Sequence, residues 1–425
     1  MIVVGGGFGG IAAAKELSKS HHEVLIIDRT NHHLFQPLLY QVATAALSPG
    51  DIATPIRGIF SGKDNIKVMM GEVSAVDKER SEVELSDGRR LPFDYMVMAP
   101  GARYNYFGND HWQEHATALK SISNALDIRE RILISLEKAD QFPRAEDRRS
   151  YLTYVVIGGG PTGVEMAGAI AEIAKRNMMR DFRHIDPGET HVILVEAMDQ
   201  LLNAYPRDLA DHAKSDLEKM GVDVRLNSPV EEITHEGVKL PDGFVATPNV
   251  IWAAGVAASP LLQTLDMETD KTGRVKVNKD ASLPGYENIF VIGDAACLED
   301  ENGDPLPALA PVALQMGKHA GRIIKKEIPA GQRPAFRYID KGTMATIGRA
   351  KAVANVKGIK VKGLIAWMLW SLIHVFYLIG FRNRFRVMAE WMWNYITFKR
   401  GVRLITGRKD PELEKESDKL SEDLV

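Results

Sequence analysis

The sequence contains a single cysteine, Cys297, among its 425 residues. One cysteine cannot form an intramolecular disulfide, and it cannot supply the cysteine pair on which dithiol–disulfide and sulfide-oxidising redox enzymes rely. A nearly cysteine-free chain also fits a reducing compartment. The histidines are scattered without the spacing of a metal-binding motif, and no nucleophile with a neighbouring base is recognisable. We therefore expect neither thiol chemistry nor a bound metal.

A strong net charge is absent as well. The formal net charge is −3, which gives no overall attraction to nucleic acid. The composition is that of an ordinary globular protein, and the length predicts two to three domains. No signal peptide precedes the first motif, because the chain opens directly on an apolar strand. The shortness of that strand leaves open that further residues precede Met1.

The first 28 residues carry a complete dinucleotide-binding fingerprint. Residues 2–4 predict a buried parallel strand, and GGGFGG follows with Gly5, Gly7 and Gly10 in the G-x-G-x-x-G positions. A helix and a second strand ending at Asp28 come next. The first glycine permits a tight turn, the second lets the backbone approach a pyrophosphate, and the third lets the helix pack on the sheet. The carboxylate of the acid can accept hydrogen bonds from a ribose.

The same pattern returns in the middle of the chain. After a strand at 154–157, Gly158, Gly160 and Gly163 take the glycine positions, and the next strand ends at Glu196. An acid there suits a free 2′-hydroxyl and repels a 2′-phosphate, which predicts NADH over NADPH. Two fingerprints imply two nucleotides. The simplest chemistry that joins them is hydride transfer between a nicotinamide and a flavin.

Glu165 follows the second glycine motif, and the sequence places it in the first turn of the helix that begins there. One interpretation is the favourable position of an acid at the positive end of a helix. The other is a polar or proton-relaying group beside the contact between nicotinamide and flavin. On the sequence alone we prefer the first.

The two halves of the chain repeat one order of elements. After the first fingerprint, residues 87–102 read as a hairpin that leads to a strand ending in Ala-Pro-Gly, and residues 241–259 repeat this phrase after the second. A helix-rich linker is expected at about 121–150. This internal repeat predicts an α/β chain with two tandem Rossmann-like, doubly wound dinucleotide-binding domains.

A further apolar strand lies at residues 287–296 and ends at Gly293 and Asp294, followed by small residues. A carboxylate at the end of a strand can hold the polyol or pyrophosphate edge of a cofactor. A helix N-cap is the alternative interpretation, and it does not exclude that role.

The C-terminal region supplies the hydrophobic run that the rest of the chain lacks. Residues 363–381 contain no charge apart from the titratable His374. From 356 to 408 there are ten lysines and arginines against one acid, and aromatic residues lie among them. This pattern is typical of the headgroup zone of an anionic leaflet. The run could lie in the interface as a monotopic anchor, span the bilayer or form a core helix.

We prefer the monotopic placement, because the run only just reaches spanning length and the flanking charges would need partners in a core. His374 and Ser371 form a polar pair one turn apart on this run. We interpret the histidine as hydrogen-bonded at an interface rather than as a quinone-facing group. Residues 409–425 are charged and poor in apolar side chains, which predicts a disordered tail.

Several motifs resemble those of type II NADH:quinone oxidoreductases, single-subunit NADH dehydrogenases that do not pump protons. They are GGGFGG, HHLFQPLLYQVATAALSP, VVIGGGPTGVE, VIWAAGV, NIFVIGDAA and KGTMATIGR, together with the apolar, aromatic C-terminus. The resemblance runs from Met1 to about Arg408. FQPLLYQVATAALSP and KGTMATIGR are its most specific elements, because the glycine motifs alone match many flavoproteins.

The resemblance implies a discontinuous FAD-binding domain at 1–115 and 275–350, with an NADH-binding domain at 116–274 inserted between its parts. Residues 351–408 would form a membrane-anchoring and quinone-access region, and 409–425 the tail.

The resemblance also implies functional residues. Glu165 and Gln315 would be catalytic, with Gln315 facing the quinone from a helix whose N-terminus meets the flavin. The residues that would bind FAD and NADH are Gly5, Gly7, Phe8, Gly9, Gly10, Asp28, Arg29, Val73, Gly101, Gly293, Asp294, Ala310, Pro311, Gly158, Gly160, Pro161, Thr162, Gly163, Glu196 and Gly255.

One position departs from the family. Many members have a glutamine beside the flavin where this chain has Pro311. A proline lacks both the N–H and a side-chain amide, although it can open a helix in its first turn. Pro311 cannot make the quinone contact of that glutamine, and we expect Gln315 to make a larger share of the contacts with the quinone.

The implied activity is hydride transfer from NADH to non-covalent FAD, followed by two-electron reduction of ubiquinone or menaquinone without proton pumping. This reaction would serve respiratory electron transport at the cytoplasmic face of a bacterial inner membrane. The implied partners are NADH, a quinone and the bilayer surface, a homodimer is compatible with the resemblance, and nucleic acid is not expected.

Two alternatives to this activity were weighed. They are a membrane-anchored flavin reductase with a soluble acceptor and an NADH-sensing flavoprotein similar to apoptosis-inducing factor. The segment 356–408 argues against both, because membrane docking is what a lipid-soluble acceptor requires.

Overall fold

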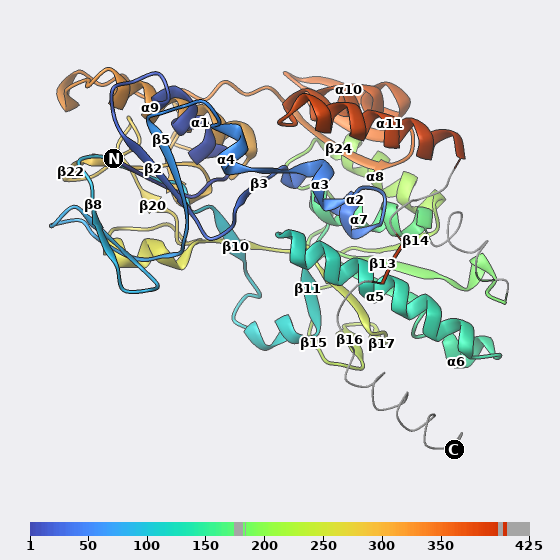
Figure 1. Cartoon of the computed structure of the whole chain (residues 1–425). Coiled ribbons are helices and arrows are strands. Elements are labelled where there is room, and N and C mark those ends of the chain that lie inside the picture. The colour runs from blue at the N-terminus through green and yellow to red at the C-terminus, as the bar shows by residue number, and fades with distance from the viewer. Residues whose placement is uncertain (174–181, 183, 398–402, 406–425) are drawn as a thin grey trace, which may run out of the picture.

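Two parallel sheets form the centres of two α/β units that lie side by side in the computed structural model (Figure 1). The structure describes residues 1–173, 182, 184–397 and 403–405, so the predicted tail lies outside the described residues. The first sheet has the order β21 (Ser282–Leu283), β22 (Tyr286–Val291), β9 (Met96–Met98), β1 (Ile2–Val4), β2 (Val24–Asp28), β5 (Ile66–Met70). The second has the order β11 (Ala116–Ala118), β18 (Asn249–Trp252), β12 (Thr153–Ile157), β13 (His191–Val195), β14 (Val222–Arg225).

Neighbouring strands in both sheets run parallel, apart from the edge strand β21. Strands β1, β9 and β12 are buried throughout, as their unbroken apolar sequences predict. The helices are α1 (Phe8–Leu17), α2 (Leu39–Ala43), α3 (Pro49–Ile52), α4 (Ile56–Ile59), α5 (Ile122–Gln141), α6 (Ala145–Arg148), α7 (Pro161–Glu172), α8 (Arg207–Lys219), α9 (Ala310–Lys325), α10 (Gly363–Tyr377) and α11 (Phe381–Thr397).

The predicted internal repeat is confirmed. Each unit begins with a strand, a glycine turn, a helix and a second strand that is followed or ended by an acid. A three-stranded antiparallel sheet comes next, and then a strand that pairs with the first strand. These antiparallel sheets are β6 (Val73–Asp77), β7 (Glu82–Leu85), β8 (Arg90–Pro92) and β15 (Glu232–Ile233), β16 (Gly237–Leu240), β17 (Gly243–Ala246).

A two-stranded ribbon connects the units, and it corrects one predicted boundary. Strands β10 (Ala102–Tyr104) and β19 (Val256–Ala258) pair antiparallel where the chain leaves and re-enters the first unit. Leu262 and Leu265 beyond the ribbon are buried in the core of the first unit. The second unit therefore ends near residue 256 rather than 274, since these apolar side chains complete the other core.

The expected helix-rich linker is present as α5 and α6, but α5 is part of the second unit. Ala125, Ile128 and Ile132 are buried in the same core as the strand residue Tyr154. The apolar face of α5 therefore covers the second sheet instead of spanning a gap.

The C-terminal unit begins earlier than predicted. Strands β24 (Thr343–Gly348), β25 (Lys351–Val356) and β26 (Ile359–Lys362) form one antiparallel sheet, so the expected boundary at 350/351 falls inside its first hairpin. This sheet packs against α7 through a glycine, because a Cβ atom on Gly168 would overlap the carbonyl oxygen of Ile347. The C-terminal unit thus lies on the second unit, as Figure 1 shows.

The FQPLLYQVATAALSP segment leaves the first unit and packs where the second and C-terminal units meet. Its Phe35, Leu39 and Leu47 belong to the second unit's core. Its Gln41 accepts a hydrogen bond of 2.7 Å from the Trp391 indole of α11. This motif therefore ties all three units together.

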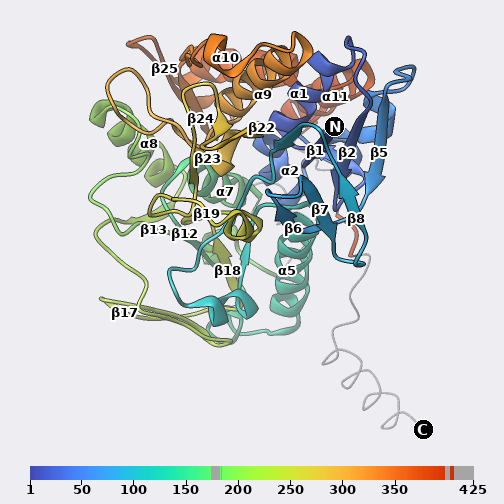
Figure 2. The same cartoon turned by 90° about the vertical axis from the view of Figure 1, so that its left-hand side faces the viewer.

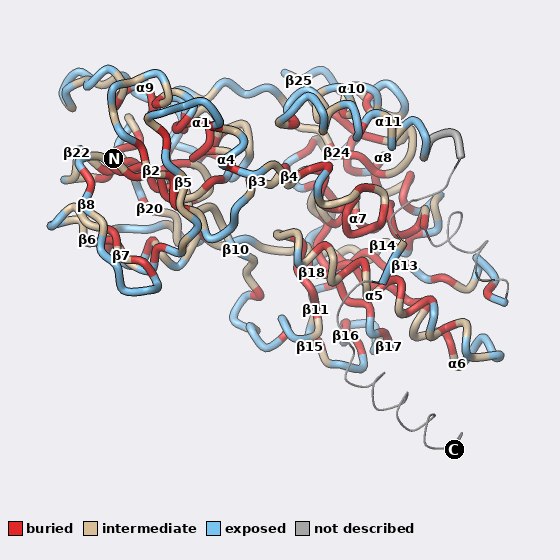
Figure 3. The backbone as a smooth tube through the Cα atoms, viewed as in Figure 1, coloured by how far each residue is buried: buried red, intermediate tan, exposed pale blue. Residues whose placement is uncertain are grey.

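The long apolar run at 363–381 forms one helix and the turn that follows it, and only its last residue belongs to the next helix. Helix α10 ends at Tyr377, and Gly380, with a φ of +92°, turns the chain into α11. Only Ala366 and Trp370 of α10 are buried, which excludes the core-helix placement. Both helices expose large apolar side chains, and Figure 3 colours many of their residues as exposed. Across the described part of the chain, no helix is both long enough and apolar enough to cross a bilayer.

We predict that Gly168→Ala separates β24 from α7 and destabilises the protein by about 1–3 kcal/mol, because the new methyl group has no space against the carbonyl of Ile347. Thermal unfolding should show a lower Tm than in the wild type. Gly331→Ala is the control, since no atom lies within 4 Å of its added methyl group. Equal Tm values for the two variants would contradict the contact.

Candidate functional sites: two glycine loops and the surfaces around them

The first glycine loop forms the turn that the fingerprint predicts. Gly5 has a φ of +97°, and a Cβ atom on Gly10 would overlap the carbonyl oxygen of Gly5. Around Gly7, by contrast, no atom lies within 4 Å of an added Cβ. No side chain caps the N-terminus of α1, which begins directly after Gly7. The loop therefore presents backbone N–H groups and open space, as a pyrophosphate requires.

Asp28 closes this loop in addition to its predicted role toward a ribose. Its Oδ2 accepts a hydrogen bond of 2.6 Å from the N–H of Gly6, and its Oδ1 accepts one of 2.7 Å from the N–H of Thr30. An ionised carboxylate has about four acceptor positions, so ribose hydroxyls can still bind. Sequence reasoning missed the loop-closing role, because nothing in the spacing indicates the contact with Gly6.

The second loop has the same construction. Gly158 has a φ of +108°, a Cβ on Gly163 would overlap its carbonyl oxygen, and the space around Gly160 is open. Glu196 follows β13 and accepts a hydrogen bond of 2.6 Å from Gly159. Pro161 opens α7, with Thr162 next to it. Both loops therefore fit the pyrophosphate of a dinucleotide.

Three further segments surround the first loop. The end of β9 contacts it, because a Cβ on Gly5 would overlap the carbonyl oxygen of Ala99. A Cβ on Gly293, at the end of β22, would lie 3.0 Å from the Cβ of Ala313 on α9. Figure 2 shows α1, α9 and β22 together. The glycine loop, Gly293-Asp294 and the N-terminus of α9 thus form one cradle around the first loop.

Helix α9 begins at Ala310 as predicted, with Pro311 in its first turn. A Cβ on Gly317 would overlap the carbonyl oxygen of Gly9, so α9 crosses α1 with backbone against backbone. This crossing fixes the N-terminal end of α9 beside the first loop.

The remaining predicted binding residues lie at the starts or ends of helices and strands. Phe8 opens α1 and packs edge-on against His33 and Phe35. Val73 begins β6, Arg29 is exposed after β2, and Gly101 and Gly255 are left-handed turn residues at the two ends of the connecting ribbon.

Gln315 is less available than predicted. Its Nε2 donates to the carbonyl oxygen of Ile339 at 3.0 Å, and its Oε1 accepts from the N–H of the same residue at 3.0 Å. The amide therefore fixes the segment that leads into β24. A contact with quinone remains a prediction and would require this pair of hydrogen bonds to open.

Glu165 lies in the second turn of α7, and the first turn contains no acid, so its predicted position at the helix end is wrong. Helix α7 already starts at Pro161, inside the glycine motif, so Glu165 is its fifth residue and lies beyond the first turn. The Glu165 carboxylate accepts a hydrogen bond from the backbone N–H of Thr346 on β24, and burial raises its pKa to about 8. The group is therefore largely a neutral carboxylic acid near pH 7.

Tyr205 completes this polar cluster. Burial raises the pKa of its phenol, which lies close to Glu165 and is hydrogen-bonded to Thr343 of β24. Sequence reasoning missed Tyr205, which belongs to no motif. The threonines of KGTMATIGR were visible, but their contacts with α7 depend on tertiary packing.

Lys120, after β11, was also missed. Burial lowers the pKa of its ammonium group, and the charge of Asp294 opposes that shift. The Lys120 side chain therefore places a positive charge of the second unit near Asp294 of the cradle.

His374 fits the interpretation of a hydrogen-bonded interface residue. Its Nδ1 lies 2.7 Å from the carbonyl oxygen of Trp370, and its ring stacks on that indole at 4.2 Å between centroids. Burial lowers its pKa to about 4, so it is neutral at physiological pH.

The chain matches two family models and is similar to characterised relatives. Residues 1–317 match the family model described as pyridine nucleotide-disulphide oxidoreductase, and residues 341–400 match the NDH2 C-terminal domain. The type II NADH:quinone oxidoreductase Ndh of Mycobacterium tuberculosis is 39% identical, covering 96% of this chain and 90% of the relative.

Two solved structures share the fold. The NDH2 structure from Plasmodium falciparum in complex with NADH has a TM-score of 0.86 at 20% identity, covering 96% of this chain and 99% of the other. The sulfide:quinone oxidoreductase of Aquifex aeolicus has a TM-score of 0.72 at 17% identity, covering 93% and 95%.

We predict that the stabilising effect of a protonated Glu165 disappears as the pH rises. Because the pKa is raised from 4.5 to about 8 in the folded state, the effect is complete below pH 4.5 and is lost as the pH approaches 8. Relative to Glu165→Gln, which does not titrate, the wild-type Tm should fall progressively over this range. A Tm difference independent of pH would contradict the buried acid. Glu287→Gln, at an exposed position, is the control.

Proposed function

The chain belongs to the type II NADH:quinone oxidoreductases, and on that premise we propose that FAD binds non-covalently at the first glycine loop, NADH at the second and a membrane quinone on the side of the C-terminal helices. When bound, FAD accepts a hydride from NADH and passes two electrons to the quinone. The observation that carries the assignment is the cradle, because only the first loop is enclosed by Gly293-Asp294 and the N-terminus of α9.

The protein's own contribution is to bind and orient the cofactors. The open N–H groups at Gly7 and Gly160 receive the two pyrophosphates, and Asp28 and Glu196 accept hydrogen bonds from the riboses. Lys120 adds a positive charge near Asp294. Holding both nucleotides in a fixed geometry replaces an encounter in solution.

Glu165 is proposed as the group that holds a proton between the second unit and β24. Its carboxyl group is kept neutral by burial and receives the Thr346 N–H, and Tyr205 lies beside it. A neutral acid there can donate a hydrogen bond and hold a proton without burying a charge.

The apolar stripe on α10 and α11 is proposed to dock on the bilayer surface. Exposed large side chains recur at helical spacing along both helices, and Arg382, Arg384 and Arg386 lie at the start of α11. Apolar rings beside arginines suit a monotopic anchor on an anionic leaflet. The stripe consists of Leu364, Ile365, Met368, Leu372 and Phe376 of α10 and Phe381, Phe385, Met388, Met392 and Trp393 of α11.

The cytoplasmic face of a bacterial inner membrane is the proposed location, and either ubiquinone or menaquinone the acceptor. Anaerobic reduction of the holoenzyme by NADH, followed at the flavin absorption bands, tests the reaction. Quinone in vesicles should then reoxidise the flavin rapidly. Reoxidation by soluble acceptors alone would support the flavin reductase, and a long-lived reduced complex would support the NADH sensor.

Nucleotide specificity is expected to depend on the charge of Glu196. We predict that Glu196→Gln, which keeps an acceptor for the N–H of Gly159, raises the ratio of kcat/KM for NADPH to that for NADH about tenfold. The cause is that a neutral glutamine no longer repels the 2′-phosphate of NADPH. Asp28→Asn makes the same change in the first loop and should leave the ratio unaltered. An unchanged ratio in Glu196→Gln would overturn the assignment of this carboxylate.

Membrane docking is expected to depend on the stripe. We predict that Ile365→Glu with Leu372→Glu lowers partitioning into anionic vesicles about tenfold or more, because each substitution replaces an apolar side chain worth about 1.5–3 kcal/mol on burial. Vesicle co-sedimentation measures the change. Phe244→Glu alters an exposed apolar residue of β17, outside the stripe, and should bind like the wild type. Comparable losses in both proteins would contradict docking through α10 and α11.

A further inference from the structure

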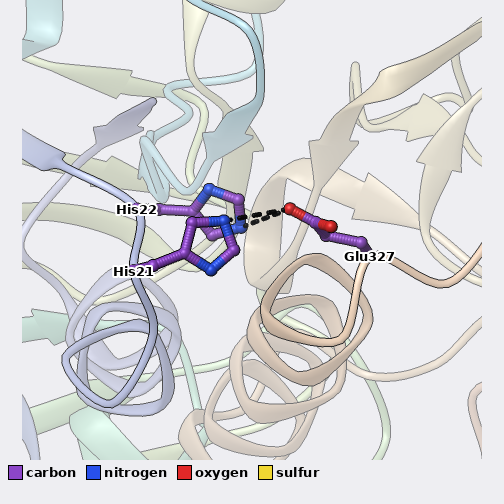
Figure 4. Close-up of side chains that lie close together, drawn as sticks. All are labelled: His21, His22 and Glu327. Carbon is purple, nitrogen blue, oxygen red and sulfur yellow. Dashed lines mark ion pairs between the residues drawn. The ribbon is translucent and has the colours of Figure 1, made fainter.

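Two histidines and a glutamate from opposite ends of the sequence meet on the surface of the first unit (Figure 4). His21 and His22 lie between α1 and β2, and Glu327 follows α9. Their potential ligand atoms all lie within 4.8 Å of one another. The Nε2 atoms of the two histidines lie 3.1 and 3.7 Å from the same oxygen, Oε1 of Glu327.

The backbone holds these three groups in a convergent arrangement. Glu327 adopts the left-handed region, with a φ of +49°, and its N–H donates to the carbonyl oxygen of Ile324 at 2.9 Å. Non-glycine residues rarely adopt that region, and one that does so is held there by its surroundings. The two imidazole rings lie 4.2 Å apart at an angle of 39°. Their nitrogens thus face the carboxylate side by side.

These separations suit a tetrahedral transition-metal ion. Ligand atoms at about 2.0–2.1 Å from Zn²⁺ in a tetrahedron are about 3.3 Å apart, close to the two measured distances. The site lies at the negative end of α9. There Nε2 of His22 is 3.3 Å from the carbonyl oxygen of Ile324 and donates a hydrogen bond to it, so a metal ion bound at this nitrogen would replace that hydrogen bond. That end of a helix favours positive charge.

We propose that His21, His22 and Glu327 bind one divalent transition-metal ion of the Zn²⁺ class, with water completing the coordination. Two imidazoles with one carboxylate suit Zn²⁺ and similar ions, whereas Mg²⁺ and Ca²⁺ prefer oxygen ligands throughout. The alternative is an ordinary ion pair of protonated histidines with the glutamate. Exposed pairs of that kind contribute little, and two adjacent imidazolium ions would repel each other.

The bound ion would clamp the loop after α1 to the C-terminus of α9. These two helices already cross with glycine backbones in contact at Gly9 and Gly317. The ion would therefore stabilise the pair of helices that carries the cradle, while lying at the opposite end of α9 from it. No step of the proposed reaction uses these three residues, so the site is independent of that proposal.

Sequence reasoning excluded a metal because it considered only ligand spacing along the chain. The two neighbouring histidines are visible in the sequence, but the third ligand lies at the far end of the first unit's discontinuous chain. Only the crossing of α1 and α9 brings it near.

Calorimetric titration of the tag-free, chelator-treated holoenzyme with ZnCl₂ tests the proposal. The expected result is one saturable site per chain, with affinity at least about tenfold lower in His21→Ala and in Glu327→Gln, as loss of a ligand should cost no less than loss of an outer-shell partner. Both positions are exposed, so folding should survive. His235→Ala is the matched control, because its exposed pair with Glu236 at 3.8 Å has no third ligand in the described structure.

Two further measurements distinguish a specific metal-binding site from nonspecific adsorption of metal ions. Co²⁺ should produce the visible absorption of a tetrahedral site, at wavelengths longer than the flavin bands, in the wild type and in His235→Ala only. Zn²⁺ should raise the Tm of the same two proteins, since a ligand that binds only the folded state stabilises it. Absence of saturable binding, or equal affinity in His21→Ala, Glu327→Gln and the wild type, would overturn the proposal.

Discussion

Backbone packed against backbone at glycines is the contact on which this structure depends. A Cβ atom would overlap a carbonyl oxygen at several such contacts, among them Gly10 on Gly5, Gly163 on Gly158, Gly317 on Gly9 and Gly168 on Ile347. The first two aim helix N-termini at the nucleotides. The third fixes α9 beside the first loop, and the fourth seats the C-terminal sheet on the second unit. In the proposed function, the route from NADH through FAD to the quinone follows these contacts.

The two repeated units differ in the segments that surround their glycine loops. Asp28 and Glu196 make equivalent hydrogen bonds of 2.6 Å to Gly6 and Gly159, so the loops themselves are nearly interchangeable. The first is enclosed by α9 and Gly293-Asp294, which suits a cofactor that stays bound. The second lacks that enclosure, which suits a substrate that must leave after each turnover.

Local spacing predicted the parts of this site that depend on local geometry. The glycine positions and the acids that end the strands could be read from the sequence, and the internal repeat followed from their recurrence. Each glycine motif with its acid is fixed within some 30 residues of chain by turn geometry and strand periodicity, whereas the start of α9 at Ala310 came from the family resemblance. The NADH-binding and FAD-binding assignments extend that reading by family resemblance.

Features that depend on tertiary contacts could not be read in this way. The pairing of Gln315 with Ile339, the burial of Glu165 under β24 and the convergence of His21 with Glu327 join segments far apart in sequence. The break at Gly380 was hidden by an uninterrupted apolar composition. Domain boundaries shifted for the same reason, since Leu262 and β24 complete cores that the sequence does not reveal.

The central claim is that each glycine loop holds its own nucleotide. An experimental structure of the holoenzyme soaked with NADH tests it most directly. The account predicts the FAD pyrophosphate over residues 5–10 and the NADH pyrophosphate over residues 158–163, with both riboses on the strand-end acids. NADH bound at the first loop, or a single dinucleotide shared between the loops, would contradict it.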